Sequence, residues 1–210
     1  MNKYSVIIPT MWKDSSIFEL LNEFYLCELV SEVILINNNR KDTPNFTKHK
    51  KLLYIEPYEN IFVNPAWNMG VSIASNQHIT IVNDDVLFDV NQYFNFMNMA
   101  KEYVDAGYVG SHSKNYEISE LEDTTIEDYD NKTNMGGWGC LFSFNKKNWI
   151  PIPSQLKIWY GDNWIHLTNR MIFQLNGFPI KTKMSVSSDL KEVRSVRDND
   201  TLEWNKLIVK

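Results

Sequence analysis

The sequence predicts an α/β domain built on an open, mostly parallel sheet flanked by helices. Short β-branched runs such as "YSVIIP" (4–9) and "HITIV" (78–82) alternate with stretches of helical periodicity. This order of strand and helix implies right-handed crossovers and a parallel sheet. Polar clusters directly follow several of the runs, which is typical of a ligand site at the carboxyl ends of parallel strands.

In the first half, each element has its own signal. Pro9 stops the first strand, and Ser16 with Glu19 forms a capping pattern for a helix whose apolar residues are Ile17, Leu20, Leu21 and Phe24. Strands are expected at 32–36 and 51–55 and again at 78–82. Between the last two, Asn64 is the expected cap of a helix that has Pro65 at its first position.

The second half is less regular. Residues 91–107 predict a helix that ends at Gly107, and residues 117–130, with seven acids and no base, predict a mobile or solvent-facing loop. Glycines from position 136 turn the chain into a strand that ends at 144. A helix is expected from Asp162 to Gly177, and a short one behind Asp200 closes the chain. No internal repeat or linker interrupts the sequence, so a single domain over 1–210 is expected.

Composition and charge argue against several classes of function. The net charge is −5 and the pI is about 5.4, so the chain lacks the overall basic balance typical of nucleic-acid-binding proteins. Cys27 and Cys140 supply neither a disulfide framework nor zinc-ligand spacing, and both are expected to be small buried hydrophobes. The apolar run at the N-terminus is too short for a signal peptide or a membrane span, so a cytoplasmic location is expected.

The usual phosphate-binding loops are missing from the sequence. It contains neither G-x-G-x-x-G after the first strand nor G-x-x-x-x-G-K-[ST], and it has no G-x-S-x-G nucleophile motif. If the sheet binds a phosphorylated ligand, a metal ion is therefore the expected neutraliser of its charge.

Asp84 and Asp85, which follow the strand at 78–82, are the candidate metal platform. Adjacent carboxylates repel each other unless a positive charge lies beside them. Mg²⁺ and Mn²⁺ prefer oxygen ligands and often take only one or two protein carboxylates, with phosphate and water completing the shell. The alternative is a solvated turn in which one of the two acids caps the next element.

The order of these motifs resembles that of the family 2-like nucleotide-sugar glycosyltransferases of the GT-A fold. The resemblance covers about residues 4–178 and rests on "SVIIPT", "VILINNN", "NPAWNMGVSIASNQHITIV", "NDDV", "GGWGCLFSF" and "YGDNW". It implies a nucleotide-sugar-binding half over about 1–90 and an acceptor-binding half over about 91–210. It also implies a nucleotide-diphosphate-sugar donor, a UDP-sugar being the common choice, and Mn²⁺ or Mg²⁺ as cofactor.

Residue by residue, the resemblance implies that Thr10, Asn37, Asn68 and Asp84 bind the donor and that Asp85 binds the metal. The chain departs from the family pattern at three of the matched positions. Asn37 stands where the family has an acid, Trp67 replaces the Arg of the helix motif, and Asn83 opens the metal motif. No His follows His166, so the metal lacks the C-terminal ligand of many relatives and could need the diphosphate to complete its shell.

Asp162 has two interpretations. As a helix N-cap it would contribute about 1 kcal/mol and need no further role. As the counterpart of the family's base, it would accept the proton of an acceptor hydroxyl during an inverting displacement. Four nearby aromatic residues suit an acceptor pocket or ordinary core packing equally well: Trp138, Trp159, Tyr160 and Trp164.

The sequence therefore predicts a metal-dependent glycosyltransferase. A non-catalytic nucleotide-sugar-binding module and a sugar-nucleotide nucleotidyltransferase are the alternatives, and the second lacks its Gly-rich loop in "PTMWKDSS". A saccharide is the default acceptor. A hydroxymethylated base in phage DNA is the less favoured one, because no basic stripe accompanies it.

Overall fold

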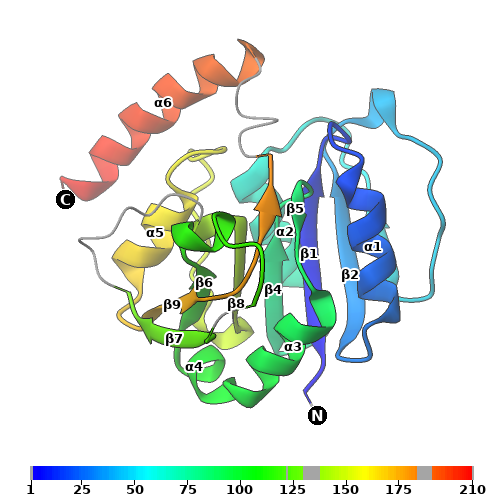
Figure 1. Ribbon diagram of the computed structural model, residues 1–210. Coiled ribbons are helices and arrows are strands. Elements are labelled where there is room, and N and C mark those ends of the chain that lie inside the picture. The colour runs from blue at the N-terminus through cyan, green and yellow to red at the C-terminus, as the bar shows by residue number, and fades with distance from the viewer. Residues whose placement is uncertain (1, 122, 130–137, 184–190, 210) are drawn as a thin grey trace.

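The fold is built around one central sheet. The computed structural model describes residues 2–121, 123–129, 138–183 and 191–209 (Figure 1). Its eight-stranded sheet has the order β3-β2-β1-β4-β8-β6-β9-β7. These strands are β1 (Tyr4–Thr10), β2 (Val30–Asn37), β3 (Leu52–Ile55), β4 (His78–Val82), β6 (Tyr108–Ser111), β7 (Thr125–Asp128), β8 (Leu141–Asn145) and β9 (Ile172–Asn176).

The expected fold class is confirmed. The four strands of the first half are parallel to one another, as are β6 and β9, whereas β8 runs antiparallel to both β4 and β6 and β7 runs antiparallel to β9. A separate two-stranded sheet pairs β5 (Val86–Leu87) with β10 (Lys181–Thr182). This small sheet brings the chain that follows β4 next to a segment almost one hundred residues later.

Helices cover both faces of the sheet (Figure 1). They are α1 (Ser16–Leu26), α2 (Val63–Ile73), α3 (Val90–Met99), α4 (Lys101–Ala106), α5 (Gly161–Thr168) and α6 (Lys191–Ile208). Within the described ranges, no helix is long and apolar enough to cross a bilayer.

Successive side chains along a strand point to opposite faces of the sheet, and this alternation divides the core into two layers. Val6 and Ile8 of β1 pack with α1 and α3, whereas Ile7 between them packs with α2 on the opposite face. A Cβ at Gly70 of α2 would overlap the Ile7 side chain, so a glycine there lets this helix lie close to the sheet. Both faces of the sheet are therefore buried, which explains the continuous apolar runs.

Two helix starts differ from expectation. Ser16 is the first residue of α1 and not its cap, because the Asp14 carboxylate accepts a hydrogen bond from Ser16 N at 2.8 Å. Asn64 lies inside α2, which begins at Val63. Its side chain is fully buried and donates to backbone oxygens of another loop. A local contact with Asp14 therefore accompanies the shifted start of α1, whereas long-range hydrogen bonds engage the Asn64 side chain and prevent it from capping α2.

Three boundaries in the second half also differ. The helix expected over 91–107 is broken at Ala100 into α3 and α4. The acidic stretch 117–130 contains an edge strand, β7, whose acids face solvent while its backbone pairs with β9. The glycine turn expected at 136–137 lies outside the described residues.

The helix expected from Asp162 to Gly177 is wrong in its second half, where α5 is followed by strand β9. A short apolar run is compatible with a helix or a strand, and pairing with β6 makes this one a strand. The closing helix is longer than expected. α6 begins at Lys191, so Asp200 lies within it and does not cap it.

Candidate active site

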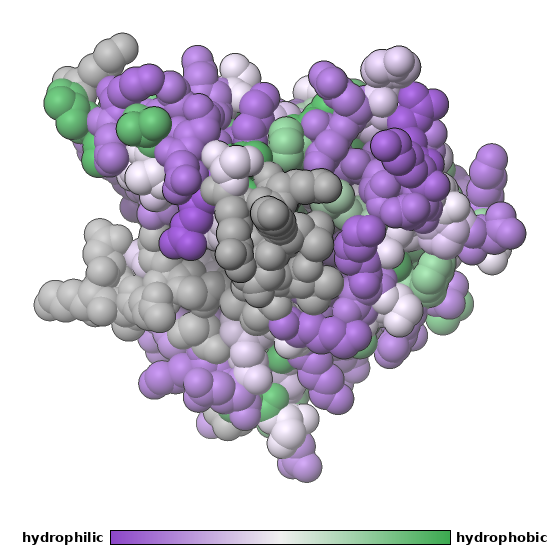
Figure 2. Space-filling view, turned by 90° about the horizontal axis from the view of Figure 1, so that it is seen from above, coloured by the Kyte–Doolittle hydropathy of each residue, from purple (hydrophilic) through white to green (hydrophobic). Residues whose placement is uncertain are grey.

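A cavity of about 490 Å³ lies where β1 and β4 end, and we call it the acidic cavity because Asp84, Asp85 and Asp162 line it. Figure 2 looks down on this edge of the molecule, where the residues drawn in colour present a predominantly hydrophilic surface. The described residues that line the cavity come from the ends of β1, β2 and β4, the start of α2, the turn before β8, the loop before α5, and α6. They include Thr10, Met11, Asn38, Phe62, Trp67, Asn83, Asp84, Asp85, Cys140, Trp159, Tyr160, Asp162, Val193 and Arg197.

Asp84 is held by Thr10, the last residue of β1, and by the backbone of the next residue. Thr10 Oγ1 donates to Asp84 Oδ2 at 2.6 Å, and the same hydroxyl accepts from Trp12 N at 2.9 Å. The backbone N–H of Met11 also donates to this carboxylate. Burial nevertheless raises the pKa of Asp84 to about 6, and repulsion from Asp85 adds to the rise.

Asp85 lies next to the two-stranded sheet of β5 and β10. The Thr182 hydroxyl on β10 donates to its carboxylate, and burial raises the pKa of Asp85 above its ordinary value. Asp14 repels it and Lys183 attracts it, but Lys183 is already paired with Asp14 at 2.8 Å. The carboxylate thus lies in a partly desolvated position where its negative charge is only weakly compensated.

Asp162 lies one residue inside α5, so it is not the helix N-cap. That position belongs to Tyr160, whose φ of 65° is left-handed. Asp162 Oδ1 accepts from Asn163 N at 3.0 Å, and burial raises the pKa of Asp162. A raised pKa is the direction that a general base needs, because a stronger base takes a proton more readily.

Cys140 lies near both Asp85 and Asp162. It lies in the turn before β8 and lines the cavity, whereas the sequence predicted a strand residue. Burial raises the pKa of its thiol to about 12, and the nearby carboxylates of Asp85 and Asp162 act in the same direction. The thiol is therefore neutral, and three carboxylates border one cavity around it.

The described residues fit a cation only in part. No group of three His, Cys, Asp or Glu side chains that could enclose a metal ion occurs among them. Asp84 and Asp85 nevertheless offer oxygen ligands, and burial makes their negative charges costly in the absence of a cation. This ligand set suits Mg²⁺ or Mn²⁺ bound by one or two carboxylates, with the remaining ligands coming from phosphate and water.

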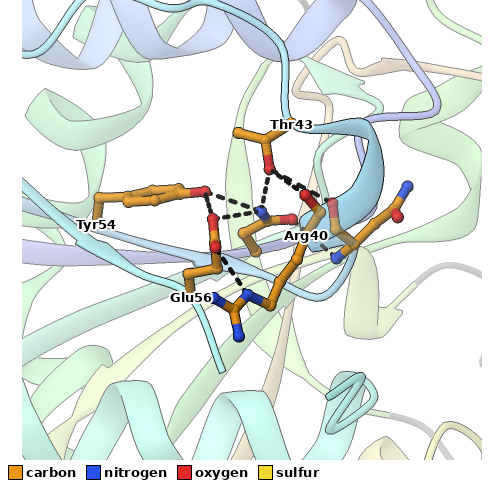
Figure 3. A network of polar contacts seen from close by, with 6 residues as sticks. Arg40, Thr43, Tyr54 and Glu56 are labelled. Atoms are coloured by element: carbon orange, nitrogen blue, oxygen red, sulfur yellow. Dashed lines mark hydrogen bonds and ion pairs between the residues drawn. The ribbon is translucent and has the colours of Figure 1, made fainter. Parts of the chain in front are cut away.

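Asn37 does not face the acidic cavity. Its fully buried amide donates to Thr43, Tyr54 and Glu56, and Glu56 also accepts from Arg40 (Figure 3). The next residue, Asn38, lines the cavity, because adjacent residues of an extended chain point to opposite sides. At the end of β2, the residue that reaches the cavity is thus Asn38, one position after the predicted Asn37.

Three other candidates lie away from the cavity lining, as far as the described residues show. Asn68 donates to Ile152 O at 2.8 Å and accepts from Trp149 Nε1 and Ile152 N, so it secures the loop after β8. Trp138 is 2% exposed and donates to Phe173 O within the core. Trp164 packs against the same core layer. Their positions fit core packing and loop anchoring, the alternatives to ligand binding.

Trp159 and Tyr160 line the cavity, as expected. Other residues of the lining were not predicted from the sequence, among them Phe62, Val193 and Arg197. Phe62 is in a backbone region that is nearly exclusive to glycine, with φ 65° and ψ 179°, which is typical of strained positions near functional sites. Val193 and Arg197 reach the cavity from α6. No local sequence signal links these α6 residues to the motifs more than a hundred positions earlier.

Of the comparisons with known proteins, the one with solved structures bears on the fold. No family model matches the sequence, and a search of curated proteins found no significant match. Among solved structures, the chain is similar to residues 1–349 of Staphylococcus aureus TarS, a glycosyltransferase, with a TM-score of 0.58 and 15% identity over 94% of this chain and 65% of that one. The chain has a GT-A-like glycosyltransferase fold.

Two further TarS structures give the same result. A longer TarS chain matches with a TM-score of 0.59 and 14% identity over 95% of this chain and 43% of that one. TarS 1–349 in complex with UDP matches with a TM-score of 0.59 and 15% identity over 85% of this chain and 59% of that one. The chain thus spans between about two fifths and two thirds of the TarS chains that it matches.

Proposed function

We propose that this domain transfers a sugar from a nucleotide-diphosphate-sugar, most simply a UDP-sugar, to an acceptor hydroxyl. The observation that carries the proposal is the convergence of Asp84 and Asp85, after β4, with Asp162, in α5, on one cavity at the carboxyl edge of the sheet. The fold shared with TarS, which has been crystallised with UDP, supports the same donor class.

The acids divide into two roles. Asp84 and Asp85 follow the strand beside β1, where the parallel strand ends favour a nucleotide diphosphate. Asp162 lies on the loop side of the cavity, next to the aromatic residues Trp159 and Tyr160. We assign the first pair to the donor and Asp162 to the acceptor.

Mn²⁺ or Mg²⁺ is the proposed cofactor, with Asp85 as its protein ligand. When bound, the ion would offset the charge that develops on the departing diphosphate. Asp84, restrained by Thr10, would hold hydroxyl groups of the donor through its free lone pairs.

The transfer itself is a single displacement. The acceptor hydroxyl gives its proton to Asp162 while its oxygen forms a bond to the anomeric carbon, and the bond from that carbon to the diphosphate oxygen breaks. The electron pair of the broken bond leaves with the nucleoside diphosphate, and the anomeric configuration inverts. The partly desolvated carboxylate is suited to this step because its affinity for a proton is increased.

A saccharide is the proposed acceptor class. Trp159 and Tyr160 offer aromatic surfaces on which sugar rings can pack. Arg197 is the single Lys or Arg side chain among the described residues of the cavity lining, so a nucleic-acid acceptor has little support there.

A ligand panel tests the proposal. The melting temperature of the purified protein is measured with UDP, GDP, ADP and CDP, each with and without Mn²⁺. One diphosphate should stabilise the protein by a few kcal/mol at high occupancy, and only when the cation is present. Release of that nucleotide from its sugar conjugate distinguishes a transferase, which slowly uses water as acceptor, from a non-catalytic binding module. A panel without any stabilising nucleotide contradicts the proposed donor.

A further inference from the structure

The loop that leads to Asp162 depends on contacts far away in the sequence. Residues 157–160 connect the segment after β8 to α5, and their chain ends in the left-handed Tyr160. This conformation costs about 1 kcal/mol or more for a residue other than glycine. Surrounding contacts must therefore stabilise the loop in the geometry that places Asp162.

Asp200 of α6 provides several of these contacts. Its side chain is completely buried, and its carboxylate accepts hydrogen bonds from three consecutive backbone N–H groups of the loop. The distances are 3.0 Å from Lys157 N, 2.8 Å from Ile158 N and 2.9 Å from Trp159 N. A buried carboxylate is stable only when such donors compensate its lost hydration, so Asp200 and the loop specify each other's position.

The same helix also binds the loop through side chains. The Tyr160 and Trp204 rings are stacked with centroids 5.3 Å apart and planes 7° from parallel, and the Tyr160 hydroxyl lies 3.0 Å from Thr201 Oγ1. The Arg197 guanidinium lies over the Trp159 ring, 5.1 Å from its centroid. Four residues of α6 at helical spacing thus form one face directed at the loop.

The opposite side of the loop rests on α2. Asn64 Nδ2 donates to Leu156 O and Trp159 O, and Asn64 N donates to Lys157 O. A Cβ at Gly161 would overlap Asn64 Oδ1, so the glycine allows the loop to approach α2. The loop is consequently held between α2 and α6, and only α6 supplies a charged group.

We propose that Asp200 is a positioning residue for the catalytic base. It holds the backbone of residues 157–159, and through the short connection to α5 it sets where the Asp162 carboxylate lies relative to the acceptor. The inference rests on the proposed function for the role of Asp162. The structural part, that Asp200 orders the loop, is independent of it.

The test compares Asp200→Asn and Asp200→Ala with Asp198→Asn, which removes an exposed carboxylate from the same helix. Asp200→Asn keeps the side-chain shape and replaces one acceptor oxygen by an NH₂ group that faces N–H donors. Amide hydrogen exchange is measured for residues 157–162 and for β1 and α1 as internal references.

We expect both Asp200 variants to increase exchange at 157–162 by tenfold or more while exchange in β1 and α1 changes little. Unchanged exchange in the loop overturns the proposal. Exchange that rises equally in every element of both variants also overturns it, because Asp200 would then stabilise the whole fold and not one loop.

Kinetics test the link to Asp162. With the UDP-sugar that the protein hydrolyses best, Asp200→Asn should lower kcat by about tenfold, leave the Kd for UDP with Mn²⁺ within twofold, and shift the pH profile of kcat. A looser loop with wild-type kcat and pH profile overturns the positioning role. If the wild-type protein neither binds a nucleotide nor hydrolyses any sugar nucleotide, the proposed function fails, whereas the exchange result still decides whether Asp200 orders the loop.

Discussion

Thr10 Oγ1 donates a 2.6 Å hydrogen bond to Asp84 Oδ2, joining the end of β1 to the end of β4 across 74 positions of sequence. The bond favours the ionised form of a carboxylate whose burial favours the protonated one. Thr10 is itself held by the N–H of Trp12, so its hydroxyl is oriented before any ligand arrives. Thr10 therefore tunes the charge of the acidic pair as well as bordering the cavity.

Thr10→Val should raise the pKa of Asp84 further, because it removes a hydroxyl donor and keeps the side-chain shape. We expect the affinity for UDP with Mn²⁺ to fall several-fold at pH 6.5, with a smaller loss at pH 8, where Asp84 is ionised in both proteins. Isothermal titration calorimetry at the two pH values measures this difference. Thr10→Ser keeps the hydroxyl and serves as control, and an equal loss of affinity at both pH values would contradict the electrostatic role.

Asp85→Ala should abolish metal-dependent nucleotide binding and leave the fold intact, since the residue lies beyond the end of β4 and outside the core layers. Nucleotide binding is measured by calorimetry with and without Mn²⁺, and folding by circular dichroism and thermal melting. Asp128→Ala removes an exposed carboxylate on edge strand β7 and is the matched control for net charge. If Asp85→Ala binds nucleotide and metal as tightly as wild type, Asp85 is not the metal ligand.

Asp162→Asn keeps the shape of the side chain and its hydrogen bond from Asn163 N, but it cannot accept the acceptor's proton. Turnover should fall by about 10²-fold or more and UDP affinity should stay close to wild type, while the melting temperature should not fall, because burial raises the pKa of Asp162 and its ionised form destabilises the folded state. Steady-state kinetics with a transferable sugar nucleotide, paired with a UDP titration, separates the two effects. A variant that melts early yet turns over normally while folded would assign Asp162 to stability alone.

The pKa of Asp84 also predicts how stability depends on pH in the metal-free protein. Its folded pKa of about 6 exceeds the unfolded value of about 3.9, so the folded state binds more protons between these pH values and becomes less stable as pH rises through them. Each unit of pKa difference corresponds to about 1.4 kcal/mol. Asp84→Asn should remove this loss and be more stable than wild type above pH 6, on the order of 1 to 3 kcal/mol.

Urea unfolding of the wild type and Asp84→Asn at pH 4, 5, 6 and 7 measures the effect. The comparison between the two proteins cancels the contribution of His166, whose pKa burial lowers to about 4 and which therefore destabilises both proteins at acidic pH. A stability difference that stays constant from pH 4 to pH 7 would contradict the raised pKa of Asp84.

The amino-acid sequence by itself determined the sheet and its acidic edge. Apolar runs such as 4–9 and 78–82 form buried parallel strands, and residues directly after parallel strands meet at one edge, so Asp84 and Asp85 were predictable from local pattern. Thr10 was predictable for the same reason. These inferences succeed because strand periodicity and hydrophobicity are local properties of the chain.

The tertiary structure decided which neighbours of these residues face the cavity. Asn38 and not Asn37 lines it, since a one-residue step in an extended chain reverses the direction of the side chain. Asp200 accepts hydrogen bonds from a loop some forty positions earlier. Long-range packing of α6 creates this contact. The local sequence around Asp200 suggested a helix cap and gave no sign of it. Local pattern thus specified the strands of the first half, whereas strand pairing decided several elements of the second half, such as β9 in place of a helix. Burial and long-range hydrogen bonds selected which polar side chains became structural and which remained available to a ligand.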